Sequence, residues 1–234
     1  MNTSEMTERP VAVVTGGAGA IGGTIVRRLQ ENGHTVVILD RTGDIQCDLG
    51  DTQEVRAAAQ RVLDLHGRCD VLVHAAATFE RFTLDALDIG VWRRVQAVNV
   101  ESLLLLSEAF VPGMRERGFG RIISVASNTF WSPPTPDLLA YIASKGAVIG
   151  LTRTLAKALG PDGIAVTAVA PGLTQTPATS AGQAAEFAET VPRQALPRPL
   201  VPDDVAATVA FLATGPAAAL TGQTLITDGG LVLT

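Results

Sequence analysis

Residues 10–23 read PVAVVTGGAGAIGG, an apolar run that passes directly into a cluster of glycines. Short apolar runs of this kind are typical of strands that are buried on both faces of a parallel sheet. The glycines let the chain turn tightly, so that backbone N–H groups at the start of the following helix could approach a pyrophosphate. A glycine cluster alone is weak evidence. Its place between a strand and a helix favours dinucleotide binding over a tight turn without a ligand.

Two carboxylates follow this turn. Asp40 ends the apolar run TVVILD at 35–40, and Asp48 lies in the short stretch QCDLGD. At the carboxyl end of a strand, Asp40 could accept hydrogen bonds from both hydroxyls of an adenosine ribose, although it could also cap a turn. Asp48 could contact the edge of the adenine, and a loop carboxylate that faces water is nearly as good an interpretation.

Apolar runs alternate with amphipathic segments over the rest of the chain. This alternation predicts a single α/β domain: a doubly wound parallel sheet with helices on both faces. The expected strands cover 10–15, 35–40, 69–76, 121–127, 164–171 and 224–229, and the expected helices cover about 20–32, 52–66, 92–117, 141–159 and 203–213. We expect residues 1–9 to form a loose tail before this domain, which spans 10–234, and 174–202 to form a substrate loop.

Composition excludes several classes of protein. Apolar residues make up 47% of the 234 residues and the net charge is −5, with no basic stretch that could follow a phosphate backbone, so nucleic acid is not an expected partner. The first nine residues lack the apolar core of a signal peptide, and no apolar run reaches membrane-spanning length. Cys47 and Cys69 match no metal-ligand spacing. We therefore expect a soluble, cytoplasmic protein without a metal.

The stretch YIASK, at 141–145, contains the only tyrosine of the chain. Tyr141 and Lys145 are four residues apart and share a helix face. An ammonium beside a phenol lowers the phenol pKa from about 10, and the phenol could then exchange a proton with a carbonyl or alcohol oxygen. The pair alone is more often a packed ring beside a snorkelling lysine. Ser127 could hold the substrate oxygen, and the amide of Asn99, amid apolar neighbours, could join a water chain to the lysine.

From about residue 9 to its end, the sequence resembles the short-chain dehydrogenase/reductases. The matching motifs occur in order: TGGAGAIG, Asp40, CDLGD, VNV at 98–100, GRIISVAS, YIASK, APGLTQT at 170–176 and TGQTLITDGG at 221–230. The resemblance implies a Rossmann-type fold and the catalytic tetrad Asn99, Ser127, Tyr141 and Lys145. Tyr141 would be the acid/base, Ser127 would orient the substrate oxygen, Lys145 would hold the nicotinamide ribose, and Asn99 would anchor a relay water.

The same resemblance implies a binding site for NAD. Besides Asn99, Tyr141 and Lys145, its expected residues are Gly16, Gly17, Ala20, Ile21, Gly22, Asp40, Arg41, Asp48, Leu49, Ala75, Ala76, Pro171, Gly172, Thr174 and Thr176. Thr176 would fix the nicotinamide carboxamide.

The sequence departs from the family pattern at two motifs. Ala20 stands where the family has the middle glycine of the turn, and HAAA at 74–77 replaces Asn-Asn-Ala-Gly. His74 either replaces an asparagine that ties neighbouring strands or is a hydrogen-bonded core histidine, and we favour the second interpretation. Phe130, Trp131 and Phe187 could line an apolar substrate pocket, or they could be core or subunit-contact aromatics.

These observations predict an NAD-dependent short-chain alcohol dehydrogenase or ketoreductase that acts on an apolar or aromatic small molecule. One alternative is a 3-ketoacyl-type reductase, which Asp40 disfavours because biosynthetic reductases of this family mostly use NADPH. The other is a catalytically silent NAD-binding regulatory or scaffold protein, which the complete tetrad disfavours. The resemblance also implies a homotetramer, and Leu103–Leu106, spread around a helix, would leave an apolar side for a partner.

Overall fold

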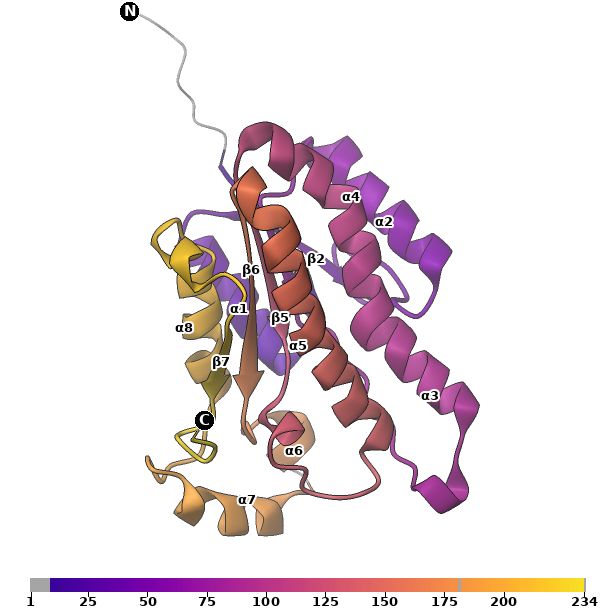
Figure 1. The fold of residues 1–234 in the computed structure, drawn as a ribbon, viewed down its shortest axis with the longest axis vertical. Helices are drawn as coiled ribbons and strands as arrows, with labels where there is room; N and C mark the ends of the chain where they lie inside the picture. Colours follow the sequence, from indigo (N-terminus) through magenta and orange to yellow (C-terminus); the bar gives the residue numbers. More distant parts are fainter. Residues whose placement is uncertain (1–8, 181, 234) are drawn as a thin grey trace, which may run out of the picture.

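The computed structural model describes residues 9–180 and 182–233, so the expected tail at 1–9 lies outside the described residues except for Arg9. Seven parallel strands form one sheet in the order β3-β2-β1-β4-β5-β6-β7, with helices on both faces (Figure 1). This confirms the predicted single-domain, Rossmann-type doubly wound sheet. The order reverses between β1 and β4, and ligands bind at such a switch point in sheets of this type.

The strands form where short apolar runs rich in β-branched residues can be buried on both faces. Their bounds are β1 (Val11–Thr15), β2 (Thr35–Asp40), β3 (Ile45–Gln46), β4 (Val71–His74), β5 (Gly120–Val125), β6 (Ile164–Pro171) and β7 (Thr224–Thr227). Six of them match the predicted strands. The edge strand β3 was not predicted, because two residues are too few to show a periodic pattern.

The main helices form two layers. Their bounds are α1 (Ala20–Glu31), α2 (Thr52–His66), α3 (Ile89–Gln96), α4 (Ser102–Arg117), α5 (Leu139–Leu159), α6 (Pro177–Ser180), α7 (Ala184–Thr190) and α8 (Pro202–Leu212). Residues of α2, α4 and α5 pack into one core on one face of the sheet, and residues of α1 and α8 pack into a second core on the other. Figure 1 shows α1 and α8 on one side and α2, α4 and α5 on the other.

The expected helix at 92–117 is interrupted. A π-helical turn, Ala97–Glu101, separates α3 from α4 and contains Asn99. Such turns insert an extra residue into the helical repeat and often occur at functional sites. The segment 174–202, expected as a loop, contains the short helices α6 and α7, which lie beyond the carboxyl end of β6 in Figure 1.

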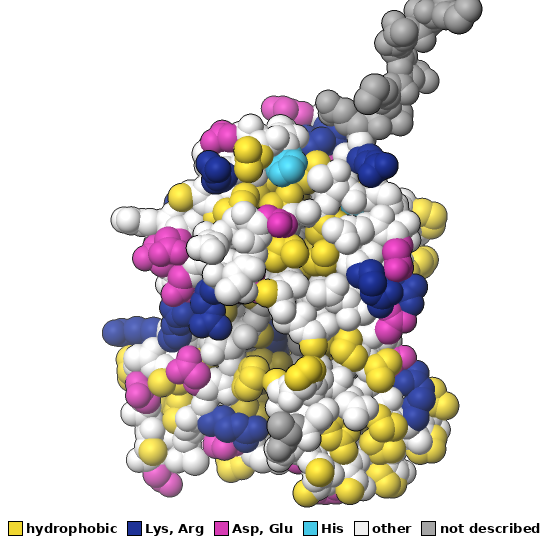
Figure 2. All heavy atoms as spheres, turned by 180° about the vertical axis from the view of Figure 1, so that it is seen from behind, with side chains coloured by type: hydrophobic (Ala, Val, Ile, Leu, Met, Phe, Trp, Pro, Cys, Tyr) yellow, Lys and Arg dark blue, Asp and Glu magenta, His cyan; other side chains and the backbone are white. Residues whose placement is uncertain are grey.

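Among the described residues, one helical run is long and apolar enough to cross a membrane by length and composition, contrary to the expectation from the sequence. This run is Ile89–Arg117, and half of its apolar window is buried inside the fold. The core helix of a soluble protein meets the same criterion, and α4 contributes Leu103, Leu106 and Phe110 to the core over the sheet. Figure 2 shows basic and acidic side chains interspersed over one face of the molecule.

Candidate active site

The glycine turn between β1 and α1 packs too closely for side chains. Gly16 has a φ of +70°, and a Cβ on it would lie 2.7 Å from the Cα atom of Ala76. A Cβ on Gly22 would lie 2.1 Å from the carbonyl oxygen of Gly16. The N-cap residue of α1 is Gly19, which has no side chain to cap the helix, so the first N–H groups of this helix are left for another acceptor. This local structure agrees with the pyrophosphate cradle predicted from the sequence.

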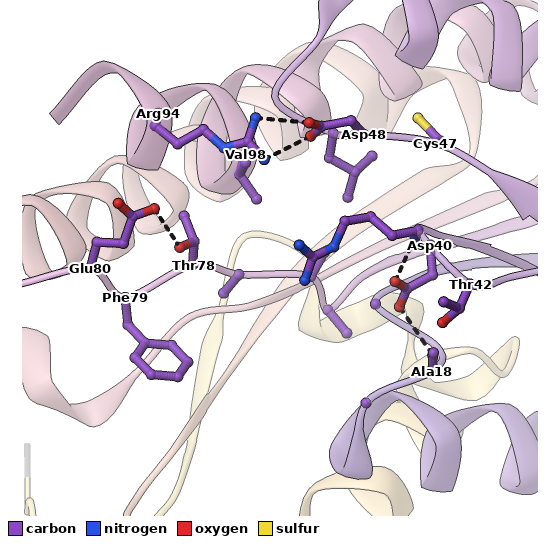
Figure 3. Close-up of a pocket in the computed structure, with 17 residues that line it drawn as sticks. Ala18, Asp40, Thr42, Cys47, Asp48, Thr78, Phe79, Glu80, Arg94 and Val98 are labelled. Carbon is purple, nitrogen blue, oxygen red and sulfur yellow. Dashed lines mark hydrogen bonds and ion pairs between the residues drawn. The ribbon is translucent and has the colours of Figure 1, made fainter. Parts of the chain in front are cut away.

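Asp40 joins this turn to the end of β2. Its Oδ2 accepts a hydrogen bond from the backbone N–H of Ala18 at 3.1 Å, and its Oδ1 accepts one from the N–H of Arg41 at 2.7 Å (Figure 3). The carboxylate lies at the edge of a cavity of about 710 Å³. Asp40 is therefore positioned to accept donors that enter this cavity.

The cavity brings together residues from several strand ends. The lining residues that the sequence predicts to bind the cofactor are Gly16, Asp40, Arg41, Asp48, Leu49, Ala75 and Ala76. The lining also includes Ala18, Gly19, Thr42, Cys47, Ala77, Thr78, Phe79, Glu80, Arg94 and Val98, which were not predicted. The other expected cofactor residues do not line this cavity. Of these, Gly17, Ala20, Ile21 and Gly22 belong to the turn and the start of α1, and Pro171, Gly172, Thr174 and Thr176 belong to the end of β6 and the segment after it.

The Tyr141–Lys145 pair lies on one face of α5, as its spacing predicts. The Lys145 Nζ lies 5.4 Å from the centre of the Tyr141 ring and donates a hydrogen bond to the carbonyl oxygen of Val125 at 2.7 Å. Ser127 precedes a short 3₁₀ turn, Asn128–Phe130, and its hydroxyl accepts hydrogen bonds from the Thr129 N–H at 3.2 Å and the Thr129 hydroxyl at 2.9 Å. The same hydroxyl is near enough to the Tyr141 phenol to lower its pKa. The structure thus places three predicted tetrad members at the carboxyl end of β5.

Burial dominates the electrostatics of this pair. It raises the pKa of the Tyr141 phenol, and the nearby Ser127 hydroxyl lowers that pKa by less. Burial also lowers the pKa of Lys145 to about 8. The sequence spacing predicts that the Lys145 ammonium lowers the pKa of the tyrosine. That prediction is wrong in direction for the structure described, because removal of the phenol from water outweighs the other effects.

Asn99 uses its side-chain amide to fix neighbouring backbone. Its Oδ1 accepts the N–H of Thr78 at 2.8 Å, and its Nδ2 donates to the carbonyl oxygen of Thr78 at 2.9 Å and to the Ser144 hydroxyl at 3.0 Å. From the sequence, this amide is expected to join a water chain to the lysine. In the structure, these protein partners occupy both ends of the amide, so the side chain holds Thr78 beside α5.

His74 ends β4 and is buried. Its Nε2 lies 2.7 Å from the Ser102 hydroxyl. Burial, followed by the nearby charge of Lys145, lowers the pKa of the imidazole to about 3, so the ring is neutral at neutral pH. These features agree with the interpretation as a hydrogen-bonded core histidine.

The three aromatics proposed for the substrate pocket lie in two places. Phe130 and Trp131 meet edge to face at 5.1 Å, and Trp131 packs against a core cluster of α5 and β6. The Phe130 ring lies against α5, since a Cβ on Gly146 would meet it at 2.8 Å. Phe187 lies in α7 and is half-buried.

One aromatic near the tyrosine was not predicted. The Phe79 ring lies edge-on to the Tyr141 ring, with 6.5 Å between their centres, and Phe79 is 60% exposed. The only sequence signal was its position shortly after the end of a strand, where functional loops of parallel sheets begin.

Comparisons with known proteins agree with this arrangement. A family model described as Enoyl-(Acyl carrier protein) reductase matches residues 16–232. The sequence is 35% identical over 240 residues to "Probable galactose dehydrogenase GalD" of Rhizobium meliloti (strain 1021), with 94% of this chain and 93% of that protein covered. It is 33% identical to Dehydrogenase/reductase SDR family member 4 of Homo sapiens, with coverages of 98% and 92%.

A solved structure gives the same fold. It comes from Beutenbergia cavernae, is assigned as a putative NAD(P)-dependent gluconate 5-dehydrogenase, and holds NADP at low occupancy. The two chains superimpose with a TM-score of 0.88 at 32% sequence identity, with 97% of this chain and 98% of the other covered.

Proposed function

Because the chain belongs to the short-chain dehydrogenase/reductase family of oxidoreductases, we propose that it interconverts a secondary alcohol and a ketone with NAD(H). The observation that carries this proposal is the Tyr141 ring, which lies 5.4 Å from the buried Lys145 ammonium, with the Ser127 hydroxyl near enough to lower the pKa of the phenol. This places a proton-exchanging group beside a hydroxyl that could orient the reacting oxygen.

The described residues fit a dinucleotide. The turn at Gly16 and Gly22 has no room for side chains and leaves backbone N–H groups at the start of α1, which suits a pyrophosphate. Asp40 would hold the adenosine ribose, and Lys145 and Thr176 would hold the nicotinamide end. A bound nicotinamide would supply or accept the hydride.

The chain's own residues would handle the proton. Since burial raises its pKa, the Tyr141 phenol is protonated at neutral pH and can donate to the oxygen of a ketone. Ser127 would share that oxygen and hold it close to the phenol. In the reverse direction the phenolate is needed, so the rate of alcohol oxidation would increase as the pH rises.

Asp40 supports NAD as the preferred cofactor. A carboxylate accepts the ribose 2′-hydroxyl of NAD, and it repels the 2′-phosphate of NADP, which carries close to two negative charges. The neighbouring Arg41 could pair with that phosphate, but it would have to offset this repulsion and the lost ribose bonds. If the binding of NADP is less favourable than that of NAD by about 3 kcal/mol, the preference for NAD is roughly hundredfold.

The preference for NAD is tested by comparing kcat/KM for NADH and NADPH in the parent and in Asp40→Ala. We expect the parent to prefer NADH and the variant to lose most of this preference. A parent that prefers NADPH, or a ratio unchanged by the substitution, would show that Asp40 is not the selector.

The exposed Phe79 supports an apolar or aromatic substrate, because its ring offers an apolar surface beside the tyrosine. The relatives named above include a probable galactose dehydrogenase, so sugars belong in the same substrate panel. A 3-ketoacyl thioester tests the reductase alternative, and a protein that binds NADH without any turnover would indicate the silent scaffold.

Tyr141→Phe tests the reaction itself. Reduction of acetophenone, 2-heptanone and a 3-ketoacyl thioester would be followed by NADH oxidation, and oxidation of D-galactose and D-xylose by NADH formation. We expect turnover of the best substrate to fall ~10²–10⁴-fold while NADH affinity is kept. Residual activity within a few-fold of the parent would remove Tyr141 from the role of acid/base.

We also propose a soluble cytoplasmic homotetramer without nucleic-acid or membrane partners. Support for assembly comes from α4, where Leu103 and Leu106 are buried against the sheet and Leu104 is 40% exposed on another side of the helix. Light scattering at micromolar concentration tests the assembly, and a monomer would contradict it.

A further inference from the structure

A fork-shaped ion pair forms one wall of the cavity. The Arg94 Nη1 lies 3.0 Å from Oδ2 of Asp48, and its Nη2 lies 2.9 Å from Oδ1. Figure 3 shows the two side chains facing one another, joined by both contacts, with Val98 beside them. The two residues are 46 positions apart, so α3 and the stretch after β3 meet here.

This wall lies next to the expected ribose site. Asp40 pairs with Gln46 across β2 and β3, and its carbonyl oxygen accepts the N–H of Cys47 at 3.1 Å. Asp48 therefore follows a stretch that is hydrogen-bonded to Asp40. Asp40 and Asp48 both line the cavity, so a base attached to a ribose held by Asp40 would enter the space that the Asp48 carboxylate borders.

The hydrogen bonds of Asp48 leave one acceptor position open. A carboxylate has about four lone-pair sites. Oδ1 accepts the N–H of Gly50 at 2.8 Å in addition to Arg94, while Oδ2 accepts only Arg94 among the bonds described. The remaining site is on Oδ2, and both side chains are partly exposed, at 38% for Asp48 and 40% for Arg94. An incoming donor can therefore reach it.

The surrounding chain keeps the guanidinium in place. A Cβ on Gly50 would lie 2.2 Å from the Arg94 Nη1, so the glycine leaves the space that the side chain occupies. The hydrogen bond from Arg94, with that from Gly50, lowers the pKa of Asp48 and keeps it a charged acceptor. A bidentate contact also restricts rotation of the carboxylate.

We propose that Arg94 is a positioning residue that fixes Asp48 so that the free lone pair of its carboxylate reads the exocyclic amino group of adenine. This inference rests on the proposed function, because it assigns the base of the same cofactor. A donor at that position is accepted by the carboxylate. A carbonyl oxygen at the same position is repelled by it, so the pair discriminates between adenine and hypoxanthine.

The test compares NADH with reduced nicotinamide hypoxanthine dinucleotide, in which an oxygen replaces the 6-amino group. Both fluoresce through the same dihydronicotinamide, so one titration method measures both dissociation constants. The variant is Arg94→Met, and the matched control is Arg93→Met, which removes an exposed arginine from the adjacent position of the same helix. Arg94→Lys is the second variant, since it keeps the charge and removes the fork.

We expect the parent and Arg93→Met to bind NADH roughly tenfold to hundredfold more tightly than the hypoxanthine analogue, as for a hydrogen bond to a charged acceptor. In Arg94→Met this ratio should fall to within about threefold, and Arg94→Lys should lie between the two. A merely structural arginine would weaken both ligands equally and leave the ratio unchanged.

An unchanged ratio in either Arg94 variant, or a parent without discrimination, would overturn the inference. A parent that binds neither dinucleotide would overturn the proposed function itself, and this inference with it.

Discussion

The buried His74 is expected to make the fold sensitive to acid. Its imidazole titrates with a pKa of about 3 in the folded protein, mainly because of burial, whereas an exposed histidine titrates near pH 6.5. Between these values the unfolded chain binds more protons than the folded one, so the free energy of unfolding decreases as the pH falls. This contribution to stability is complete above about pH 6.5 and is lost towards pH 3.

The size of the effect follows from the two pKa values. Each pH unit inside this window changes the free energy of unfolding by at most about 1.4 kcal/mol. Between pH 7 and pH 5 a group with an unfolded pKa of about 6.5 and a folded pKa of about 3 removes about 2 kcal/mol. A single-domain protein with ordinary stability of about 5–15 kcal/mol would show such a loss clearly.

The assay is urea unfolding followed by circular dichroism at about pH 7 and pH 5, for the parent and for His74→Asn. The variant restores the residue type of the family motif and removes the titrating group. All other titratable groups are the same in both proteins, so their contributions cancel in the comparison. We expect the parent to lose about 2 kcal/mol more than the variant between the two pH values. Equal losses, within about 0.5 kcal/mol, would refute a neutral buried imidazole.

Three further predictions concern the site. Lys145→Met should reduce turnover and NADH affinity together, which kinetics and fluorescence titration would measure, because the ammonium is expected to hold the nicotinamide ribose beside Tyr141. Unchanged affinity would argue against the ribose contact. Asn99→Ala should lower the free energy of unfolding by about 1–3 kcal/mol and reduce turnover, because Thr78 loses two hydrogen bonds beside Phe79 and Tyr141. A variant that unfolds at the same denaturant concentration as the parent would contradict this role of the Asn99 side chain. Hydrogen exchange should be faster in 174–202 than in β5 and should slow when NADH and a substrate bind; equal and unchanged protection would exclude a lid.

The sequence predicts the sheet well because its strands are buried on both faces and each has a strong local pattern. The elements it misses are short or irregular. The two residues of β3 and the four of α6 are too few for periodicity, and the π-helical turn at Asn99 has the same apolar pattern as the helices on either side. Local propensity does not report a change of helical register.

The site residues also divide into those with a local sequence signal and those without one. Gly16, Asp40 and Ser127 are predictable from sequence because each follows or ends a strand, and the carboxyl ends of parallel strands meet at one edge. Arg94 and Phe79 were not predicted, since nothing in a helical pattern or a loop shows which way a side chain points. The prediction for the pKa of Tyr141 fails for a related reason. The spacing to Lys145 is visible in the sequence, whereas the burial of the phenol results from tertiary packing.

One helical run connects the two ends of the expected cofactor site. Arg94, in α3, holds Asp48 at the expected adenine end, and Asn99, in the π-helical turn, holds Thr78 and Ser144 at the end where Tyr141 lies. The extra residue of a π-helical turn rotates α4 about the helix axis relative to its direction in an uninterrupted helix. Both contacts depend on the position of this run over the sheet, which Leu103 and Leu106 fix through the core. A substitution that shifts the run should therefore affect cofactor affinity and turnover together, whereas Arg94→Met and Asn99→Ala, which each disrupt one of these two ends, should separate them.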